Sequence, residues 1–427
     1  MISTDRRWVF CFEGVPGRAE TARRPGLRHR LLALTGPADL DFIYKPIDKA
    51  RQLTREASMI KSPKGRPPFR ADHVGSLLRP PILRQAFKDY FAKRIDDAHF
   101  AQIQDQCIRD VVKLQEDTGL EVVTDGEFRR GSYWSRFVER IDGFVIKPAV
   151  FKFRDDHGHE VEFTAPYAAA KLSRAQPLAL DEFSFLRDVS KATAKITLPS
   201  PSTMHFYRCT DFADSNAYSS VEAFFADLGR IFREEIAELA KAGCQYIQLD
   251  EVAIALLCDP AIRQKVENTG QKPDHLVDLY IESLNDAGAG APAGVTFGVH
   301  MCRGNFKGHY LGTGGYESVA ERFFSRTKVN HFLLEYDTER AGDFKPLRFV
   351  KDKGVVLGLV SSKTPVLEDI ELLKRRVGEA TQYIDLDRLA VSPQCGFAST
   401  VAGNPVTEAD ERAKLKLVVD AAKAIWH

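Results

Sequence analysis

The sequence predicts a (β/α)₈ barrel with an inserted hairpin after its second strand. From residue 69 onward, short apolar or β-branched runs alternate with longer stretches of helical period, which is the pattern of repeated βα units around a parallel sheet. Eight such runs are present, enough strands to close a barrel. Each run begins apolar and ends in polar, glycine or metal-binding residues.

The predicted strands follow one another along the chain at FRADHVGS (69–76), EVVTDGE (121–127), KITLPSP (195–201), YIQLDE (246–251), TFGVHMC (296–302), HFLLEYD (331–337), GVVLGLVS (354–361) and LAVSPQCG (389–396). Helical candidates lie between them, among them 99–117, 221–242, 316–326, 366–381 and 408–425. In a parallel barrel all strand C-termini lie on one face, which carries the active site. For a single run the polar residues could simply mark the strand end. Because all eight runs change from apolar to polar toward their C-terminal ends, we expect polar side chains to converge on that face.

Residues 128–194 are too long for a single βα connection. Within them FVIKPAVFKF and HEVEFTA flank the polar stretch RDDHG, which indicates a β-hairpin. Such a hairpin could cover the barrel mouth and shield a substrate from water, or it could be a surface or oligomerisation element. Both interpretations stay open.

Residues 1–65 are predicted to be a poorly ordered N-terminal extension, which leaves 66–427 as the barrel domain. The extension has scattered arginines and no sustained hydrophobic period. The arginines would fit an organelle transit peptide, but the acidic residues Asp5, Glu13 and Glu20 oppose that reading. Alternatively, Met59 is the biological start.

The overall composition is that of a soluble protein. The 427 residues are 44% hydrophobic and 28% charged, which allows one large domain with a substantial core. A net charge of +1 favours neither a nucleic acid nor a membrane as partner. No apolar run reaches membrane-spanning length and the N-terminus lacks a secretory signal, so we expect a cytoplasmic protein. The seven cysteines, an odd number, are not expected to form a disulfide framework.

Four residues at predicted strand ends form a candidate zinc site. His300 and Cys302, two apart in GVHMCRGNF, project to the same side of a strand. Taken alone, this pair could be a buried histidine beside a buried cysteine. In a barrel, however, Glu335 from the sixth strand and Cys395 from the eighth would join them. This set of N, S, O and S donors suits Zn²⁺ in tetrahedral geometry.

A zinc ion held by two thiolates and a carboxylate is suited to activating sulfur rather than water. A free thiol has a pKa of about 8.5 and is mostly protonated at neutral pH, whereas the thiolate is the nucleophile. Coordination to zinc deprotonates the thiol. Anionic ligands leave the metal less electrophilic, so the bound sulfur keeps enough electron density to attack carbon. We therefore expect a small-molecule thiol as substrate.

The GS, DGE, QLDE and HMC segments with a later CG, in this order, resemble the catalytic barrel of the cobalamin-independent methionine synthase family. The similarity covers roughly residues 68–425 and corresponds to the short, single-barrel form of the family. The resemblance implies zinc ligation by the four residues named above. It also implies an amino-acid pocket formed by the backbone around Val74, Gly75 and Ser76 and by the carboxylates of Glu127 and Asp250.

The residues of this implied pocket have a plausible physical role. Glu127 and Asp250 end the second and fourth predicted strands, where two carboxylates could bind an ammonium group. Each could instead be a solvated strand end or a helix-capping acid. Ser76 could offer a hydroxyl and a backbone N–H to a substrate carboxylate, although a Gly-Ser turn is the commoner meaning. Glu251 points to the opposite face and is expected to be structural.

The sequence departs from the family where the methyl donor would bind. Lys363, in VSSK, stands where full-length synthases carry a catalytic histidine, and a lysine can bind an anionic group of substrate or donor. Leu256 replaces the glutamate that contacts folate, and Tyr207 is the nearest aromatic residue to the missing stacking tryptophan. These departures weigh against folate as donor. Lys363 and Asp250 are the candidate catalytic residues.

Three functions are compatible with this pattern. The first, in methionine biosynthesis, is methyl transfer to homocysteine or a related thiol from a folate, a methylated corrinoid protein or a small methyl compound. The second is a thiol alkyltransferase that opens an epoxide or takes another alkyl group, with Lys363 holding an anionic thiol. The third is a barrel with structural zinc that binds or regulates, whose closed four-coordinate metal has no affinity for thiols.

Overall fold

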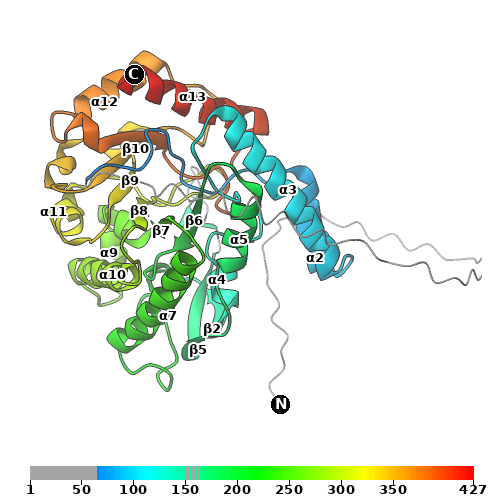
Figure 1. The fold of residues 1–427 in the computed structure, drawn as a ribbon. Coiled ribbons are helices and arrows are strands. Elements are labelled where there is room, and N and C mark those ends of the chain that lie inside the picture. The colour runs from blue at the N-terminus through cyan, green and yellow to red at the C-terminus, as the bar shows by residue number, and fades with distance from the viewer. Residues whose placement is uncertain (1–64, 151–152, 155–159, 162) are drawn as a thin grey trace, which may run out of the picture. The chain divides into compact units, whose positions relative to one another are not determined.

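A curled parallel sheet of seven strands forms the centre of the protein in the computed structural model, in the order β1-β6-β7-β8-β9-β10-β11 (Figure 1). The structure describes residues 65–150, 153–154, 160–161 and 163–427. The strands are β1 (Val122–Val123), β6 (Thr193–Pro199), β7 (Tyr246–Glu251), β8 (Thr296–Met301), β9 (His331–Glu335), β10 (Gly354–Val360) and β11 (Leu389–Pro393). The predicted α/β class with a parallel sheet is confirmed. The predicted N-terminal extension lies, except for Gly65, outside the described residues.

The first predicted strand, 69–76, was wrong in extent. The segment makes one parallel bridge, between Ala71 and Val391 of β11. Two backbone hydrogen bonds hold it there, from Asp72 to Val391 and from Val391 to Arg70, at 3.0 and 2.9 Å. Gly75, at φ +137°, then takes the chain out of the extended conformation. The segment thus lies along β11 without forming a full strand.

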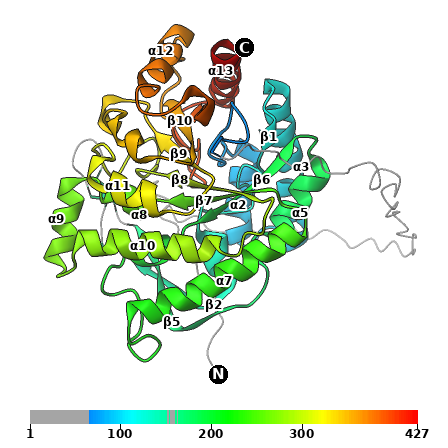
Figure 2. The same cartoon turned by 60° about the vertical axis from the view of Figure 1, so that its left-hand side comes forward.

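Helices cover the outside of the sheet (Figure 2). They are α2 (Pro81–Phe91), α3 (Asp97–Thr118), α4 (Ser135–Glu139), α5 (Leu180–Val189), α6 (Thr203–Phe206), α7 (Val221–Lys241), α8 (Ala253–Leu256), α9 (Pro260–Asn268), α10 (Pro273–Gly288), α11 (Glu317–Arg326), α12 (Ile370–Ala380) and α13 (Glu408–Trp426). Three short 3₁₀ helices, η1 (Glu339–Ala341), η2 (Lys345–Phe349) and η3 (Leu386–Arg388), complete the connections.

The longest helices begin at residues that can cap them. The hydroxyl of Ser220 accepts a hydrogen bond from the backbone of Ala223 at the start of α7, and Thr407 forms a capping box with Asp410 at the start of α13. Helix α7 then buries apolar side chains at helical spacing, including Phe224, Leu228, Ile231 and Ile236. This apolar stripe fixes the side of the helix that faces the protein.

The long insertion holds two antiparallel strand pairs. β2 (Ile141–Pro148) pairs with β5 (Thr164–Arg174), and β3 (Phe153–Arg154) pairs with β4 (Glu160–Val161). The predicted hairpin had its strands at 144–153 and 159–165, whereas β2 begins earlier, at Ile141, and β5 continues to Arg174. The residues that join the pairs lie partly outside the described residues. The backbone N–H of Val150 donates to the carbonyl of Tyr207, at 2.8 Å, and so attaches the insertion to the segment that follows β6.

The interior of the sheet contains a buried polar network as well as apolar residues. Lys195 and Asp72, both fully buried, form an ion pair at 2.8 Å. The hydroxyl of Tyr246 donates to the other oxygen of Asp72 at 2.6 Å, and Lys195 also donates to Oε1 of Gln248 at 3.1 Å. Each charged group therefore has partners that offset its burial. Among the helices of the described residues, none is both long and apolar enough to cross a membrane.

Candidate metal and substrate site

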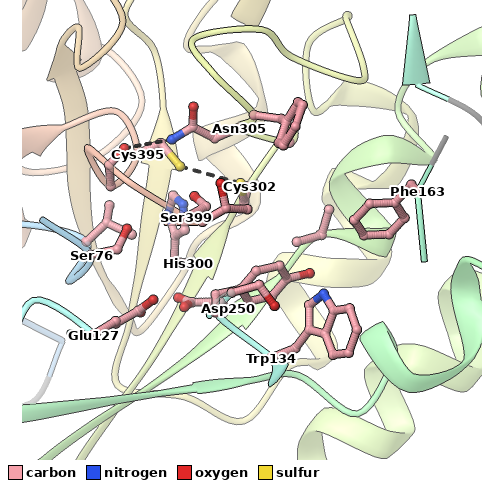
Figure 3. A pocket seen from close by; sticks show the side chains of 18 of the residues that line it. Ser76, Glu127, Trp134, Phe163, Asp250, His300, Cys302, Asn305, Cys395 and Ser399 are labelled. Carbon is pink, nitrogen blue, oxygen red and sulfur yellow. Dashed lines mark hydrogen bonds between the residues drawn. The ribbon is translucent and has the colours of Figure 1, made fainter. Parts of the chain in front are cut away.

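Four side chains with metal-binding atoms meet at the C-terminal end of the sheet. Figure 3 shows three of them, His300, Cys302 and Cys395. His300 is the last but one residue of β8 and Cys302 follows that strand, while Glu335 ends β9 and Cys395 lies two residues beyond β11. All four are buried, and their ligand atoms lie within 4.8 Å of one another. The parallel strands, which end on the same side of the sheet, bring together residues up to 95 positions apart, counted from His300 to Cys395.

His300 and the two cysteines have the geometry of metal ligands. Nδ1 of His300 lies 3.2 Å from the carbonyl oxygen of Leu333, which fixes the ring and directs Nε2 toward Cys395. Nε2 is buried without a regular hydrogen bond among the described residues. The sulfur atoms of Cys302 and Cys395 lie 3.5 Å apart. Two sulfur ligands of a tetrahedral zinc ion, with bonds of about 2.3 Å, would be roughly 3.8 Å apart. The donor set therefore fits Zn²⁺.

Electrostatics favour the anionic form of two donors, Cys395 and Glu335, whereas the hydrogen bond with Cys395 and burial raise the pKa of Cys302. Cys302 shares a hydrogen bond with Cys395, and His300 is adjacent; together they outweigh burial and place the pKa of Cys395 well below its usual range. For Glu335, burial disfavours the charged form, but the charges of Lys363, Arg340 and Arg303 outweigh it and lower the pKa. Both groups are thus held ready as anions. Metal ligands must be deprotonated to bind.

Glu335 is oriented by groups outside the cluster. The backbone N–H of Arg303 donates to its Oε1 at 2.8 Å, and Arg340 lies 3.3 Å from its Oε2. Arg303 is itself fully buried against Tyr316, whose hydroxyl lies 3.0 Å from the guanidinium. Partners of this kind orient metal ligands in known metal sites.

A pocket adjoins the four donors, and its polar part contains the predicted carboxylates. Ser76, Glu127 and Asp250 line it together with Val74. Gly75 is not among the lining residues; its carbonyl accepts a hydrogen bond from Thr124 at 2.6 Å, and a side chain in its place would meet Thr197. That the 74–76 segment binds substrate stays a prediction.

Glu127 is held in an unusual conformation. Its φ of +62° lies in the left-handed region, which is uncommon for a residue other than glycine and often marks a functional site. Its Oε1 accepts a hydrogen bond from Thr197 at 2.8 Å and lies 3.6 Å from the guanidinium of Arg130. Its Oε2 is buried without a partner among the described residues. That oxygen is available to a positively charged ligand.

Asp250 is the second carboxylate of the polar part. Burial raises its pKa to about 7, the charge of His300 opposes the shift, and the charge of Glu127 adds to it. A nearby ammonium group would favour the ionised form of Asp250. By contrast Glu251 turns away and accepts hydrogen bonds from Ser202 and from the backbone of Ile254, at 2.7 and 2.8 Å. Its predicted structural role agrees with these contacts.

The other part of the pocket is aromatic. Tyr133, Trp134, Phe163 and Tyr207 line it, and we call this set the aromatic wall. Only Tyr207 was a sequence candidate. Trp134 and Phe163 come from the insertion, where aromatic residues are equally expected in a core. Spacing alone offers no signal that they face a pocket.

Lys363 stands beside the metal donors rather than in the pocket wall. It follows β10, is half-buried, and its Nζ lies 3.4 Å from Oδ1 of Asn305, which does line the pocket. Its charge acts on Glu335 and Cys302. Leu256, the second departure noted in the sequence, is buried in α8.

Residues 70–424 match the family model described as cobalamin-independent synthase, catalytic domain. The chain belongs to this family. The protein YxjH of Bacillus subtilis, described as uncharacterized, is 37% identical over 382 residues, covering 88% of this chain and 99% of the relative. A methionine synthase of Pyrococcus abyssi is 26% identical over 325 residues, covering 76% of this chain and 85% of the relative.

A solved structure of another member of the synthase family has the same fold. It is that of a Listeria monocytogenes protein provisionally named a vitamin-B12 independent methionine synthase, with a TM-score of 0.67 and 30% identity. The match covers 84% of this chain and 98% of the other. The family resemblance read from the sequence is confirmed, in its single-domain form.

Proposed function

We propose that the protein is a zinc-dependent S-methyltransferase whose acceptor is homocysteine or a related amino-acid thiol. The observation that carries the proposal is the convergence of His300, Cys302, Glu335 and Cys395 directly beside a pocket with two buried carboxylates. The methionine synthases among its relatives support the same class of reaction.

Zinc bound by these four residues would hold the acceptor sulfur as a thiolate, which is the nucleophile. The protein's own groups prepare the site for this. Leu333 fixes the ring of His300, and the backbone of Arg303 orients Glu335. Because all four donors are buried, competing water is largely excluded from the sulfur.

The polar part of the pocket would bind the amino-acid end of the acceptor. The unpaired Oε2 of Glu127 and the carboxylate of Asp250 can both accept hydrogen bonds from an ammonium group. Two acidic groups in one buried pocket repel each other, and a cation between them relieves that repulsion. Ser76 offers a hydroxyl to the opposite, carboxylate end of the ligand.

Zinc-edge X-ray absorption of the zinc-loaded protein, with and without homocysteine, tests the proposal. We expect an additional sulfur scatterer at the metal when homocysteine is present. Homoserine, which carries oxygen in place of sulfur, is the matched control and should add none. A four-coordinate metal that ignores homocysteine would contradict the proposal and support structural zinc.

A further inference from the structure

The aromatic wall has the shape of a partial cage. The rings of Trp134 and Phe163 have centroids 6.5 Å apart and planes at 78°, and those of Phe163 and Tyr207 are 4.9 Å apart with planes at 62°. Figure 3 shows Trp134 and Phe163 on one side of the pocket and Ser76 and Glu127 on the other, with His300 and Cys302 between them. Rings set at steep angles to one another, as these are, can face a small group from several sides.

Two buried donors in the same region have no hydrogen-bond partner among the described residues. The indole Nε1 of Trp134 and the hydroxyl of Ser132 are buried without a hydrogen bond among the described residues, and both residues line the pocket. A buried donor left unpaired costs about 1–3 kcal/mol, so such groups usually meet a ligand or water. This observation, which is independent of the rings, indicates that a ligand with a polar end binds here.

The charge of the pocket favours a cation. Two carboxyl groups, those of Glu127 and Asp250, line the pocket, whereas the guanidinium of Arg130 is already paired with Glu182 at 2.7 Å. Aromatic faces add to this attraction through their quadrupoles. Within the described part of the chain, no lysine or arginine stacks on Trp134 or Tyr207. Tyr167, outside the pocket, does carry Lys147 over its ring at 3.1 Å.

Among the described residues, the titratable groups of the aromatic part are Tyr133 and Tyr207. Burial raises the pKa of both hydroxyls well above the ordinary value of tyrosine, so neither is an effective proton donor. A methyl donor whose leaving group departs as an anion needs a proton at that point. A donor whose leaving group departs neutral needs none.

We propose that the methyl donor is a small onium compound, a sulfonium or quaternary ammonium, whose cationic centre binds against Trp134, Phe163 and Tyr207. This inference rests on the proposed methyltransferase function and names its second substrate. The acceptor thiolate forms a bond to the methyl carbon while the bond from that carbon to the onium centre breaks. The bonding pair stays with the departing sulfur or nitrogen, which leaves as a neutral sulfide or amine. No proton or redox partner is required.

Calorimetric titration of the zinc-loaded, full-length protein measures recognition of the cation separately from turnover. Choline has a positively charged nitrogen at its centre, whereas 3,3-dimethylbutan-1-ol has a neutral carbon there. The two compounds otherwise have the same shape. We expect choline to bind on the order of tenfold more tightly. Equal affinities in the wild-type protein would overturn the inference without any variant.

Substitutions locate the binding site. Trp134→Leu should abolish the preference for choline, and Trp134→Phe should retain part of it. Trp426→Leu is the matched control and should leave the preference unchanged. Trp426 is the last residue of α13 and stacks on Arg70. If both Trp134 variants kept the full preference, the cation would bind elsewhere and the inference would fail.

Turnover distinguishes this inference from the proposed function. Trimethylsulfonium and homocysteine should give methionine and dimethyl sulfide in equal amounts. If homocysteine adds a sulfur to the zinc but trimethylsulfonium gives no product and a methylated pterin does, the onium inference is wrong and the methyltransferase proposal stands. If homocysteine leaves the zinc spectrum unchanged, the methyltransferase proposal itself fails.

Discussion

Gln248 donates a 2.8 Å hydrogen bond from Nε2 to Oδ1 of Asp250, two residues further along β7. The same nitrogen donates to the carbonyl of Val74 at 2.6 Å, and Oε1 faces the ammonium of Lys195. Because Lys195 can only donate, it fixes which way the amide of Gln248 points. The buried ion pair of the barrel interior is thus connected to the carboxylate that lines the pocket.

Gln248→Met should weaken binding of the amino-acid thiol more than it slows turnover. The substitution removes a hydrogen bond to Asp250 and further disfavours the charged form of this carboxyl group. The ammonium group of the substrate is then attracted less strongly. We expect KM for homocysteine to rise roughly tenfold, with kcat changed less. Steady-state kinetics checks this, with Gln382→Met, at an exposed glutamine, as control. A fall in kcat at constant KM would contradict it.

The four metal donors should determine zinc content. His300→Ala and Cys395→Ser should each lower bound zinc well below one ion per chain, measured by atomic absorption after dialysis. Cys244→Ser is the matched control, because Cys244 is also buried but lies before β7, away from the cluster. Circular dichroism would establish that each variant is folded. Full zinc occupancy in a folded Cys395→Ser protein would remove Cys395 from the ligand set.

Glu411 should make the protein less stable as pH rises toward 8. This buried carboxyl accepts a hydrogen bond from the backbone of Leu78 at 2.8 Å, and burial raises its pKa from 4.5 to about 8. Between pH 4.5 and about 8, Glu411 therefore keeps its proton in the folded state but has lost it in the unfolded state. Its stabilising contribution is present below about pH 4.5 and is lost as pH rises to about 8.

Glu411→Gln should therefore gain stability relative to the wild type between pH 5 and 8. Urea denaturation at several pH values measures the difference, which should grow as pH rises. Glu267→Gln, at an exposed position of α9, should show no such trend. A constant difference across this range would mean that Glu411 is not protonated in the folded protein.

The sequence predicted the metal cluster better than the substrate pocket, for a physical reason. Histidine and cysteine are uncommon residue types, so His300 and Cys395 stood out as candidate metal donors once the strands were placed. Trp134 and Phe163 reach the pocket through an insertion whose path depends on long-range pairing of β2 with β5. The predicted role of Gly75 in the pocket stays a prediction, since its φ of +137° and the proximity of Thr197 call for a glycine whether or not a ligand binds.

Lys363→Ala should raise KM for the anionic end of a substrate while leaving zinc content intact, because an ammonium is not a zinc ligand. Lys363 lies beside the pocket, 3.4 Å from Asn305, where a substrate carboxylate could reach it. A charge-assisted hydrogen bond is worth roughly 1.5–3 kcal/mol, so kcat/KM should fall on the order of tenfold to a hundredfold.

Arginine at position 363 should restore part of this loss, because the charge returns with a different geometry. Lys351→Ala is the control, since this exposed lysine precedes β10 whereas Lys363 follows it, at the other end of the strand. Loss of turnover at unchanged KM would mean that Lys363 acts in the chemical step. The charge of Lys363 also lowers the pKa of Glu335. Loss of turnover together with reduced zinc content would therefore mean that the substitution acts through Glu335. An alanine variant with no defect would leave Lys363 as a solvated charge at the rim.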